Sequence, residues 1–481
     1  MAWRLPSGGM KGFHRDVWLV VLLNIIAKPL WLIADNLAQD KIGHADYGLI
    51  KALLGLGQWA TSLSDWGMYL MVARRIAQNP QQYAEISSIT FSLRTLLSFA
   101  GIFLFLWIGW LIGYRHFALL WLALLLIYQT SISYLQFFRA FLQGFQRFRA
   151  DAFFSAAEKA VAILFLALGW PYLSGNLYVG LLTLSGVIVA IISAGWVWRL
   201  YGRPAWRFHP SLLWGMLQEI TPFALMTHVT ALNERINQVL LERWESPYAN
   251  GLYWGAYRWF SAAMMYLWLV LPLFFARFAR LGRTYSPELR QTFQWGQVVS
   301  ALPIIGITGI FLYAPELFML LLRQSTPAEQ KLMSQVLQVL ALSLLVQGFF
   351  AIYSTYLTAN GHEMAILWIM VASTVANVAG CAYLLPWGQA LGAAWALTLS
   401  YLMQCGGYVW VFSRKAPLRP PIGLLLRLGG VAVGYLSTLA IGRYGLGLSS
   451  WGVLGLALVA LPFWTWLNGL LRFLRYAGSF R

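Results

Sequence analysis

Long uncharged, apolar stretches recur along the chain and are separated by short polar breaks. Single stretches cover residues 95–114, 117–138, 291–315, 332–361 and 444–471. Two longer ones, 160–198 and 364–413, are interrupted by turn-forming residues at 171–176 and 386–388. A helix needs about 20 apolar residues to cross the hydrocarbon core of a bilayer. Each single stretch therefore predicts one spanning helix, and each longer stretch predicts a helical hairpin.

Five further apolar stretches contain charged residues, and they cover residues 17–33, 47–71, 220–241, 250–272 and 422–441. Together the stretches predict an all-α polytopic membrane protein with about fourteen transmembrane helices. The first stretch follows Arg4, Lys11 and Arg15 without a small-residue cleavage pattern. We therefore expect it to be a retained span rather than a signal peptide.

The composition supports a membrane protein and argues against an enzyme. Of 481 residues, 59% are hydrophobic and 10% are charged, whereas a soluble domain carries roughly 25% charged residues. The two cysteines, Cys381 and Cys405, lie in apolar stretches and indicate neither a disulfide nor a metal site. The sequence has no phosphate-binding loop, zinc-protease or nucleophile-elbow motif, and no loop large enough for a catalytic domain. We expect no catalytic residues, no metal and no cofactor.

The chain is strongly basic, with 34 Lys and Arg against 16 Asp and Glu and a net charge of +18. Such an excess can indicate nucleic-acid binding. If the N-terminus is cytoplasmic, however, 23 of the 34 basic residues fall on the cytoplasmic side, as basic residues of membrane proteins do. The charge therefore predicts topology: a multi-pass protein with both termini cytoplasmic and no nucleic-acid partner.

Four cations inside the predicted spans repeat with a fixed offset. Lys28 and Lys51 are 23 residues apart, as are Arg235 and Arg258, and the second pair follows the first by 207 residues. The same offset relates Asp35 to Glu242 and Tyr47 to Trp254. Many transporters consist of such repeats. We predict an N-lobe at 1–205, a C-lobe at 206–415 and two additional spans at 416–481, with the two lobes related by a pseudo-two-fold axis.

Two interpretations of these four cations remain open from the residues alone. Their long side chains could extend to the headgroups, since they lie about 6–12 Å from the non-cytoplasmic surface at 1.5 Å per residue. Alternatively, they line a hydrated cavity and bind an anionic ligand, since ionisable groups within spans commonly mark a transport path. The second interpretation makes Lys28, Lys51, Arg235 and Arg258 the substrate-binding residues.

The coupling or gating candidates are further charged residues in or near the spans: Asp35, Asp65, Arg139, Glu158 and Glu234. Glu234 is either a titrating or sodium-binding carboxylate or a charge partner of Arg235. Asp35 is expected at a helix end, where a solvated cap is favoured. The other three are expected near cytoplasmic helix ends, where they either form a latch between helix bundles or are solvated at the interface.

Several segments in sequence order resemble the Wzx-type polysaccharide flippases of the multidrug/oligosaccharidyl-lipid/polysaccharide (MOP, MATE-like) exporter superfamily. The clearest is Asn377–Ala396, with an Asn, a Leu-rich helix end, Pro-x-Gly and a Gly-Ala-Ala helix start. The others resemble the family's first hairpin and its seventh and eighth spans, and are Asn36–Gln39, Tyr47–Leu49, Ser64–Gly67, Arg235–Asn237, Gly251–Tyr253 and Ala256.

The resemblance implies two six-helix lobes around a central cavity, plus two C-terminal helices. It also implies alternating access and export of an undecaprenyl-diphosphate-linked oligosaccharide across a bacterial inner membrane. Related lipid II flippases place basic residues on spans 1, 2 and 8, where this chain has Lys28, Lys51 and Arg258. Lys stands at two of these positions where Arg is frequent, which leaves the identity of the ligand open.

The leading hypothesis is therefore a flippase that acts as a monomer. Its partners would be a lipid-linked glycan, membrane lipid and other polysaccharide-assembly membrane proteins. One alternative is a cation-coupled multidrug exporter of the same fold, although four cavity cations disfavour organic cations as substrates. Another is a membrane glycosyltransferase or polymerase, which would need a sizeable external loop with catalytic residues.

Overall fold

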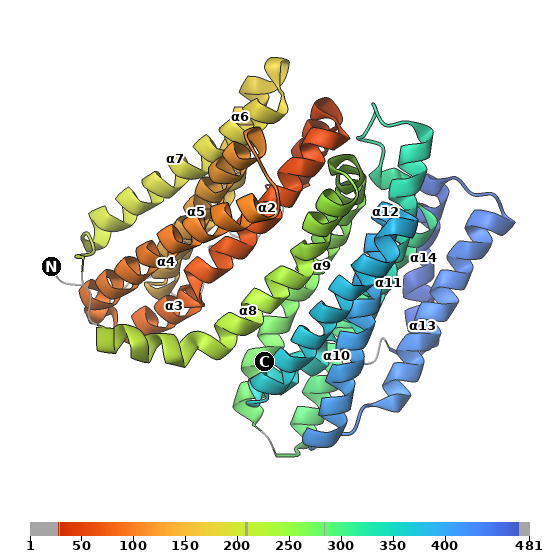
Figure 1. The fold of residues 1–481 in the computed structure, drawn as a ribbon. Coiled ribbons are helices and arrows are strands. Elements are labelled where there is room, and N and C mark those ends of the chain that lie inside the picture. Colours follow the sequence, from red (N-terminus) through yellow and green to blue (C-terminus); the bar gives the residue numbers. More distant parts are fainter. Residues whose placement is uncertain (1–26, 28, 207–209, 283, 471–481) are drawn as a thin grey trace. The chain divides into compact units, whose positions relative to one another are not determined.

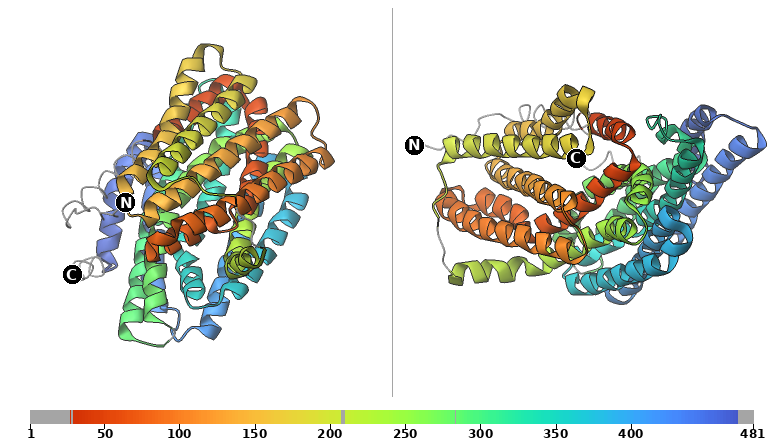
Figure 2. Two further views of the ribbon diagram at one scale, coloured as in Figure 1. Left: turned by 90° about the vertical axis from the view of Figure 1, so that its left-hand side faces the viewer. Right: turned by 45° about the horizontal axis from the view of Figure 1, so that its top comes forward.

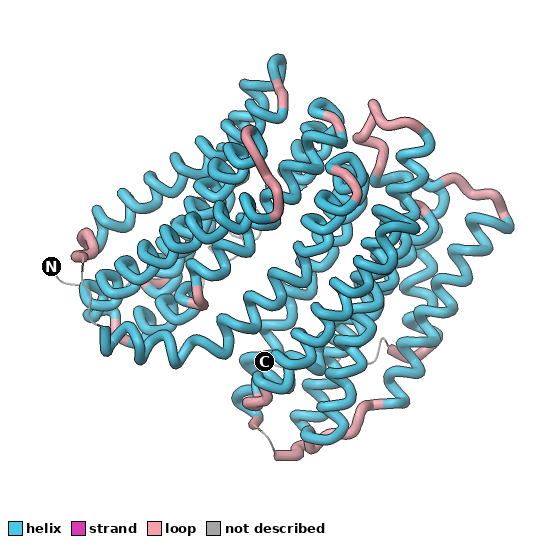
Figure 3. Tube along the Cα trace, viewed as in Figure 1, coloured by secondary structure: helices cyan, strands magenta, loops and turns pink. Residues whose placement is uncertain are grey.

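The computed structural model describes residues 27, 29–206, 210–282 and 284–470. Every regular element in these ranges is helical, and short loops connect the helices (Figure 3). Ten of the described helices are long and apolar enough to cross a membrane. The predicted fold class is confirmed. Most of the first predicted span, its retention at the N-terminus and the position of Lys28 lie outside the described residues.

The chain divides into two compact units, Met1–Ala231 and Leu232–Arg481. The division falls inside a single long helix, α8 (Pro210–Trp244). The three-part division into 1–205, 206–415 and 416–481 stays a prediction.

Unit 1 contains a helix over residues 29–42, then α2 to α7 and the start of α8 (Figure 1). The helices from α2 onward are α2 (His44–Asp65), α3 (Met68–Gln78), α4 (Tyr83–Leu111), α5 (Phe117–Gly144), α6 (Phe148–Gly169) and α7 (Gly175–Tyr201). Helix α5 is central, because it packs against α2, α3, α4, α6 and α7. Helices α6 and α7 lie side by side in both further views (Figure 2) and form the predicted hairpin.

Unit 2 also has a central helix, α11 (Pro327–Ala359). Its helices after α8 are α9 (Pro247–Leu281), α10 (Pro287–Tyr313), α11 (Pro327–Ala359), α12 (Glu363–Lys415), α13 (Ile422–Ala440) and α14 (Ser450–Leu467). Helix α11 packs against α9, α10 and α12. Both α5 and α11 are the fourth predicted span of their halves, so the two units share a pattern of helix neighbours.

The helix starts of unit 2 follow directly from the sequence. The hydroxyls of Ser246 and Ser286 accept hydrogen bonds from the backbone N–H groups of Ala249 and Leu289, and Thr326 forms a capping box with Glu329. A proline follows each of these three caps at the first helical position, where its missing N–H has no cost. These Ser/Thr-Pro pairs fix where α9, α10 and α11 begin.

Helix α12 consists of two antiparallel segments joined by a sharp turn. Gln389 has φ 44° and ψ −119°, far from helical values. On either side of this turn, the Ser400 hydroxyl donates to the Ser373 carbonyl over 2.8 Å. A Cβ on Gly380 would lie 3.1 Å from the Cβ of Ala396, so glycine permits the close approach. The predicted hairpin over 364–413 is confirmed.

The single span predicted over 47–71 is wrong at its C-terminal end. Helix α2 ends at Asp65 because Trp66 and Gly67 adopt left-handed conformations, with φ 41° and 76°. A left-handed tryptophan is uncommon, and no pattern in the sequence predicts it. The chain then continues into α3 as a separate helix.

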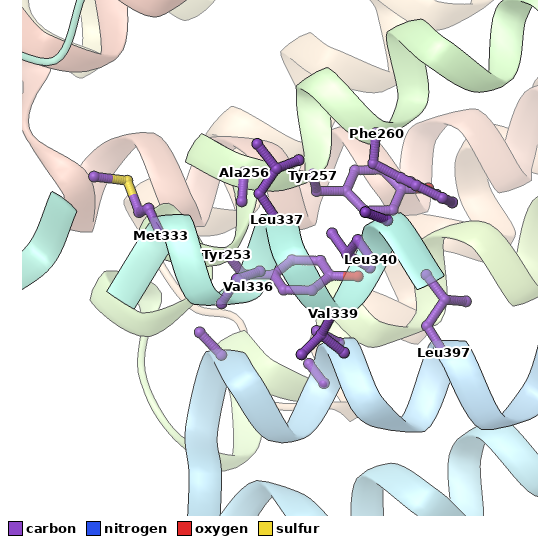
Figure 4. Close-up of a cluster of buried hydrophobic side chains, with 14 of the residues drawn as sticks. Tyr253, Ala256, Tyr257, Phe260, Met333, Val336, Leu337, Val339, Leu340 and Leu397 are labelled. Atoms are coloured by element: carbon purple, nitrogen blue, oxygen red, sulfur yellow. The ribbon is translucent and has the colours of Figure 1, made fainter. Parts of the chain in front are cut away.

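The core of unit 2 joins α9, α11 and α12. Figure 4 shows Tyr253 and Tyr257 of α9 gathered with Leu337 of α11 and Leu397 of α12. Lipid is as apolar as these side chains, so close packing holds such helices together more than the hydrophobic effect does. Gly255 illustrates the fit, because a Cβ there would come within 2.5 Å of the Met333 sulfur.

Candidate functional site

Lys51 and Asp35 form a buried ion pair in unit 1. Their charged atoms are 2.9 Å apart, and the two residues are 5% and 3% exposed. The Tyr178 hydroxyl donates to the same carboxylate oxygen over 2.8 Å. The Lys51 ammonium also lies 4.7 Å from the centre of the Tyr47 ring. This cluster connects the helix over 29–42 with α2 and α7.

The expectation that Asp35 is a solvated helix cap is wrong. Asp35 lies in the middle of the helix over 29–42, and its side chain is buried against Lys51 and Tyr178. An acid and a base that meet in a low-dielectric interior stabilise each other's charged forms. The sequence pattern could not predict this burial, because Tyr178 lies 143 positions from Asp35 along the chain.

Asp65 pairs with an arginine that the sequence analysis left out. Arg94 of α4 is fully buried, and its guanidinium donates to Asp65 over 2.7 Å and to the Ser133 carbonyl over 2.8 Å. It also bonds to the Ser133 hydroxyl and lies 5.0 Å from the Phe137 ring centre. As expected, Asp65 is at a helix end. Its partner Arg94 links α2, α4 and α5 within one unit.

Arg139 of α5 takes part in a polar chain that joins three helices. Its Nε donates to Asp151 of α6 over 2.7 Å, and Gln143 donates to the other oxygen of Asp151 over 3.0 Å. Tyr69 of α3 donates to Gln143 over 2.8 Å. Asp151 was not singled out from the sequence, although it is close to Arg139 along the chain.

The expected position of Glu158 at a helix end is wrong, because α6 starts at Phe148 and Glu158 is near its middle. Glu158 pairs over 2.6 Å with its neighbour Lys159, whose ammonium lies 5.2 Å from the ring centre of Trp31. The apolar pattern placed the helix start too late because charged residues lie along the first part of α6: Arg149, Asp151, Glu158 and Lys159.

In unit 2, Arg235 of α8 and Arg258 of α9 each contact Trp254, Arg235 at the ring and Arg258 at the backbone carbonyl. The Arg235 guanidinium lies 5.6 Å from the ring centre of Trp254 and 5.8 Å from that of Tyr257. Arg258 is 3% exposed, and its Nε donates to the Trp254 carbonyl over 3.4 Å. Tyr257 donates to the backbone carbonyl of Glu234 over 3.0 Å. The structure therefore brings together two of the predicted binding residues and Glu234.

A cluster of side-chain amides joins α8 and α12, and its members on α8, Asn233 and Asn237, flank Arg235 in the sequence. Asn377 of α12 donates to the side-chain oxygens of Asn233 and Asn237 over 3.0 and 2.7 Å. Asn237 in turn donates to the Ala393 carbonyl over 2.9 Å, and Ser400 donates to Asn233 over 3.3 Å. Asn377 was identified only as part of a family-like segment. Its role in this structure is to connect α8 with both segments of α12.

Three of the four predicted substrate-binding residues lie in the described part of the chain, and each has contacts within its own unit. Lys51 pairs with Asp35, Arg235 and Arg258 each contact Trp254, and Lys28 is outside the described residues. A single cavity that contains all four cations stays a prediction. Among the residues the structure describes, no group of three or more His, Cys, Asp or Glu side chains could hold a metal ion.

Comparison with known proteins identifies a family for this chain. Residues 13–277 match the family model described as polysaccharide biosynthesis protein. A search of the curated proteins found no match. Solved structures were similar to the chain over most of its length.

Three of those structures indicate the fold. The lipid II flippase MurJ in an inward closed conformation has a TM-score of 0.72 and 13% identity, over 93% of this chain and 98% of that one. An inward-facing multidrug resistance MATE transporter of the MOP superfamily has a TM-score of 0.62 and 14% identity, over 82% and 98%. A MOP superfamily transporter from Pyrococcus furiosus has a TM-score of 0.51 and 14% identity, over 83% and 95%.

The family and these structural relatives are transporters and flippases rather than enzymes, as the sequence predicts. The resemblance to polysaccharide flippases is confirmed at the level of the family and the superfamily fold. Because the family model covers more than half of the chain, this protein belongs to the polysaccharide biosynthesis protein family.

Proposed function

We propose that the protein is a flippase that moves an undecaprenyl-diphosphate-linked oligosaccharide from the cytoplasmic to the periplasmic leaflet of the bacterial inner membrane. It works by alternating access, as a monomer with both termini cytoplasmic and in the company of other polysaccharide-assembly membrane proteins. Membership of the polysaccharide biosynthesis family supports the glycan. The similarity in fold to a lipid II flippase supports a lipid-linked substrate.

The observation that carries the proposal is that Arg235 and Arg258, on consecutive helices, both contact Trp254. A cation inside a spanning segment is costly, by about 2.5–3.5 kcal/mol at the helix centre, and is commonly functional. Guanidinium groups present planar pairs of N–H donors that match phosphate oxygens. We propose that these two groups bind the phosphates of the diphosphate.

Lys28 and Lys51 are the other proposed substrate-binding residues, and as point charges they bind less directionally than arginine. Asp35 holds the Lys51 ammonium until the diphosphate arrives, and then resumes its role when the substrate leaves. Exchange of one anion for another keeps Lys51 compensated at each stage, which avoids the cost of an isolated buried charge. Glu234, next to Arg235, is the proposed coupling carboxylate.

The remaining gating candidates have a supporting role in this scheme. Asp65 with Arg94, and Arg139 with Asp151, hold the helix ends of unit 1 in fixed positions. In the middle of α6, Lys159 pairs with its neighbour Glu158 and lies near the ring of Trp31, which connects α6 with the helix over 29–42. These pairs keep unit 1 rigid while the transporter changes conformation.

Complementation of a strain that lacks the gene tests the function. The deletion strain should accumulate its lipid-linked intermediate, and wild-type protein should remove it. Arg258→Ala should abolish this activity at near-normal protein level, and Arg258→Lys should restore only part of it because the fork of donors is lost. Arg280→Ala, an exposed position on the same helix, is the matched control and should behave as wild type.

Two results would contradict the proposal. If Arg235→Ala and Arg258→Ala both support wild-type export, these arginines do not bind the diphosphate. If the deletion strain accumulates no lipid-linked intermediate but becomes sensitive to cationic drugs, the protein is a multidrug exporter of the same fold.

A further inference from the structure

Three segments that are far apart in the sequence meet at one end of unit 1: the start of α4, the turn between α5 and α6, and the chain after α7. The rings of Phe145 and Tyr201 stack at 3.9 Å, and Tyr83 lies against both. The Tyr83 hydroxyl donates to the Gly202 carbonyl over 3.0 Å, and the Ala205 N–H donates to Ser88 over 2.9 Å. The backbone of this end is therefore fixed by aromatic packing and hydrogen bonds.

Arginines concentrate at this fixed end. The Arg147 guanidinium lies 5.9 Å from the Tyr201 ring centre, and that of Arg203 lies 5.9 Å from the Trp198 ring centre. The last turn of α3 also belongs here, because a Cβ on Gly144 of α5 would lie 2.7 Å from the Cβ of Ile76. The exposed arginines of these segments are Arg74, Arg147, Arg149, Arg199 and Arg203.

Acidic residues do not balance this charge. Asp151, at the start of α6, is bound by Arg139 and Gln143, and Glu85 is exposed in the first turn of α4. Large apolar side chains accompany the arginines, since Trp206 is 59% exposed and Trp196 and Leu200 are also exposed. Exposed tryptophan next to arginine is the pattern of a surface at the depth of lipid headgroups.

We propose that this basic aromatic surface, formed by Arg74, Arg147, Arg149, Arg199, Arg203 and Trp206, binds the headgroup phosphates of anionic phospholipids. Charge complementarity selects the occupant: the surface offers several guanidinium donors for phosphate and exposed rings that fit among acyl chains and headgroups. A purely topological role would need the charges alone. Here two guanidiniums lie over aromatic rings on a fixed backbone, so less side-chain freedom is lost when a phosphate binds.

Lipid binding to the purified full-length protein tests the proposal. The protein in neutral detergent is titrated with phosphatidylglycerol, cardiolipin or phosphatidylethanolamine, and bound lipid is counted by native mass spectrometry. We expect saturable binding of the two anionic lipids and weak binding of phosphatidylethanolamine. Each arginine near a membrane surface contributes about fivefold in affinity, so Arg147→Gln/Arg203→Gln should weaken cardiolipin binding by about tenfold to thirtyfold.

The matched control removes the same charge from exposed positions of unit 2, in Arg280→Gln/Arg290→Gln. This control should bind cardiolipin as wild type does, and all variants should unfold at the wild-type temperature. An equal loss in both double variants would overturn the proposal in favour of a general charge effect. Tighter binding of farnesyl diphosphate than of phosphatidylglycerol, lost in Arg147→Gln/Arg203→Gln, would also overturn it, since the surface would then select polyprenyl diphosphates.

Discussion

The buried polar links that join helices differ between the two units. In unit 1, acid–base pairs join different helices: Lys51 with Asp35, Arg94 with Asp65, and Arg139 with Asp151. In unit 2, the buried link between α8 and α12 consists of neutral amides around Asn377. Arg235 of α8 and Arg258 of α9 instead lie against the aromatic rings and backbone of α9.

This difference has an energetic consequence. Removing one partner of a buried ion pair leaves an isolated charge and costs about 3–5 kcal/mol, whereas a lost neutral hydrogen bond costs about 0.5–1.5 kcal/mol. Unit 1 is therefore expected to be intolerant of single charge changes and rigid around its pairs. Unit 2 can exchange its amide contacts at lower cost, which suits the unit that contains the proposed ligand-binding residues Arg235 and Arg258.

The largest effect should follow from Arg94→Ala. The change removes the partner of Asp65 and the donor to Ser133 from a fully buried site, so it should lower the free energy of unfolding by about 3–5 kcal/mol. Thermal unfolding in detergent and the yield of folded protein measure the loss. Arg94→Ala/Asp65→Ala should recover part of the stability, because the isolated carboxylate is gone. Wild-type stability of the single variant would contradict the role of ion pairs in unit 1.

The pattern of the sequence predicted the helices well where breaks are local. Pro and Gly mark the hairpin turns at 171–176 and 386–388, and the two hairpins form there. The pattern failed where contacts between helices determine a turn or the burial of a side chain. The turn after Asp65 and the burial of Asp35 depend on residues from other helices, such as Arg94 and Tyr178.

The candidate site shows the same limit. The offset of 207 residues relates Lys51 to Arg258, and both are buried. It could not reveal that Lys51 faces a carboxylate while Arg258 contacts a backbone carbonyl. Two positions related by the offset are therefore similar in burial but different in their neighbours, because each unit surrounds them with different side chains.

The second prediction separates stability from substrate binding at Lys51. Lys51→Met alone leaves Asp35 as an isolated buried acid and should destabilise the protein by about 3 kcal/mol. Lys51→Met/Asp35→Leu replaces the whole pair with apolar groups and should return stability to within about 1–2 kcal/mol of wild type. Export of the lipid-linked glycan, measured by complementation, should stay impaired in the double variant. Full export by a stable double variant would show that Lys51 has only a structural role.

The smallest effect on stability should come from the removal of one buried tyrosine hydroxyl in each unit. Tyr178 donates to the Asp35 carboxylate over 2.8 Å, and Tyr257 donates to the backbone carbonyl of Glu234 over 3.0 Å. Both side chains are buried, so substitution by Phe removes the hydroxyl with little change in packing. A hydrogen bond to a charged group contributes about 1.5–3 kcal/mol and a neutral one about 0.5–1.5 kcal/mol. Tyr178→Phe should therefore lower the unfolding temperature more than Tyr257→Phe does. An equal or reversed order would mean that the acid–base chemistry of unit 1 does not make it the less tolerant unit.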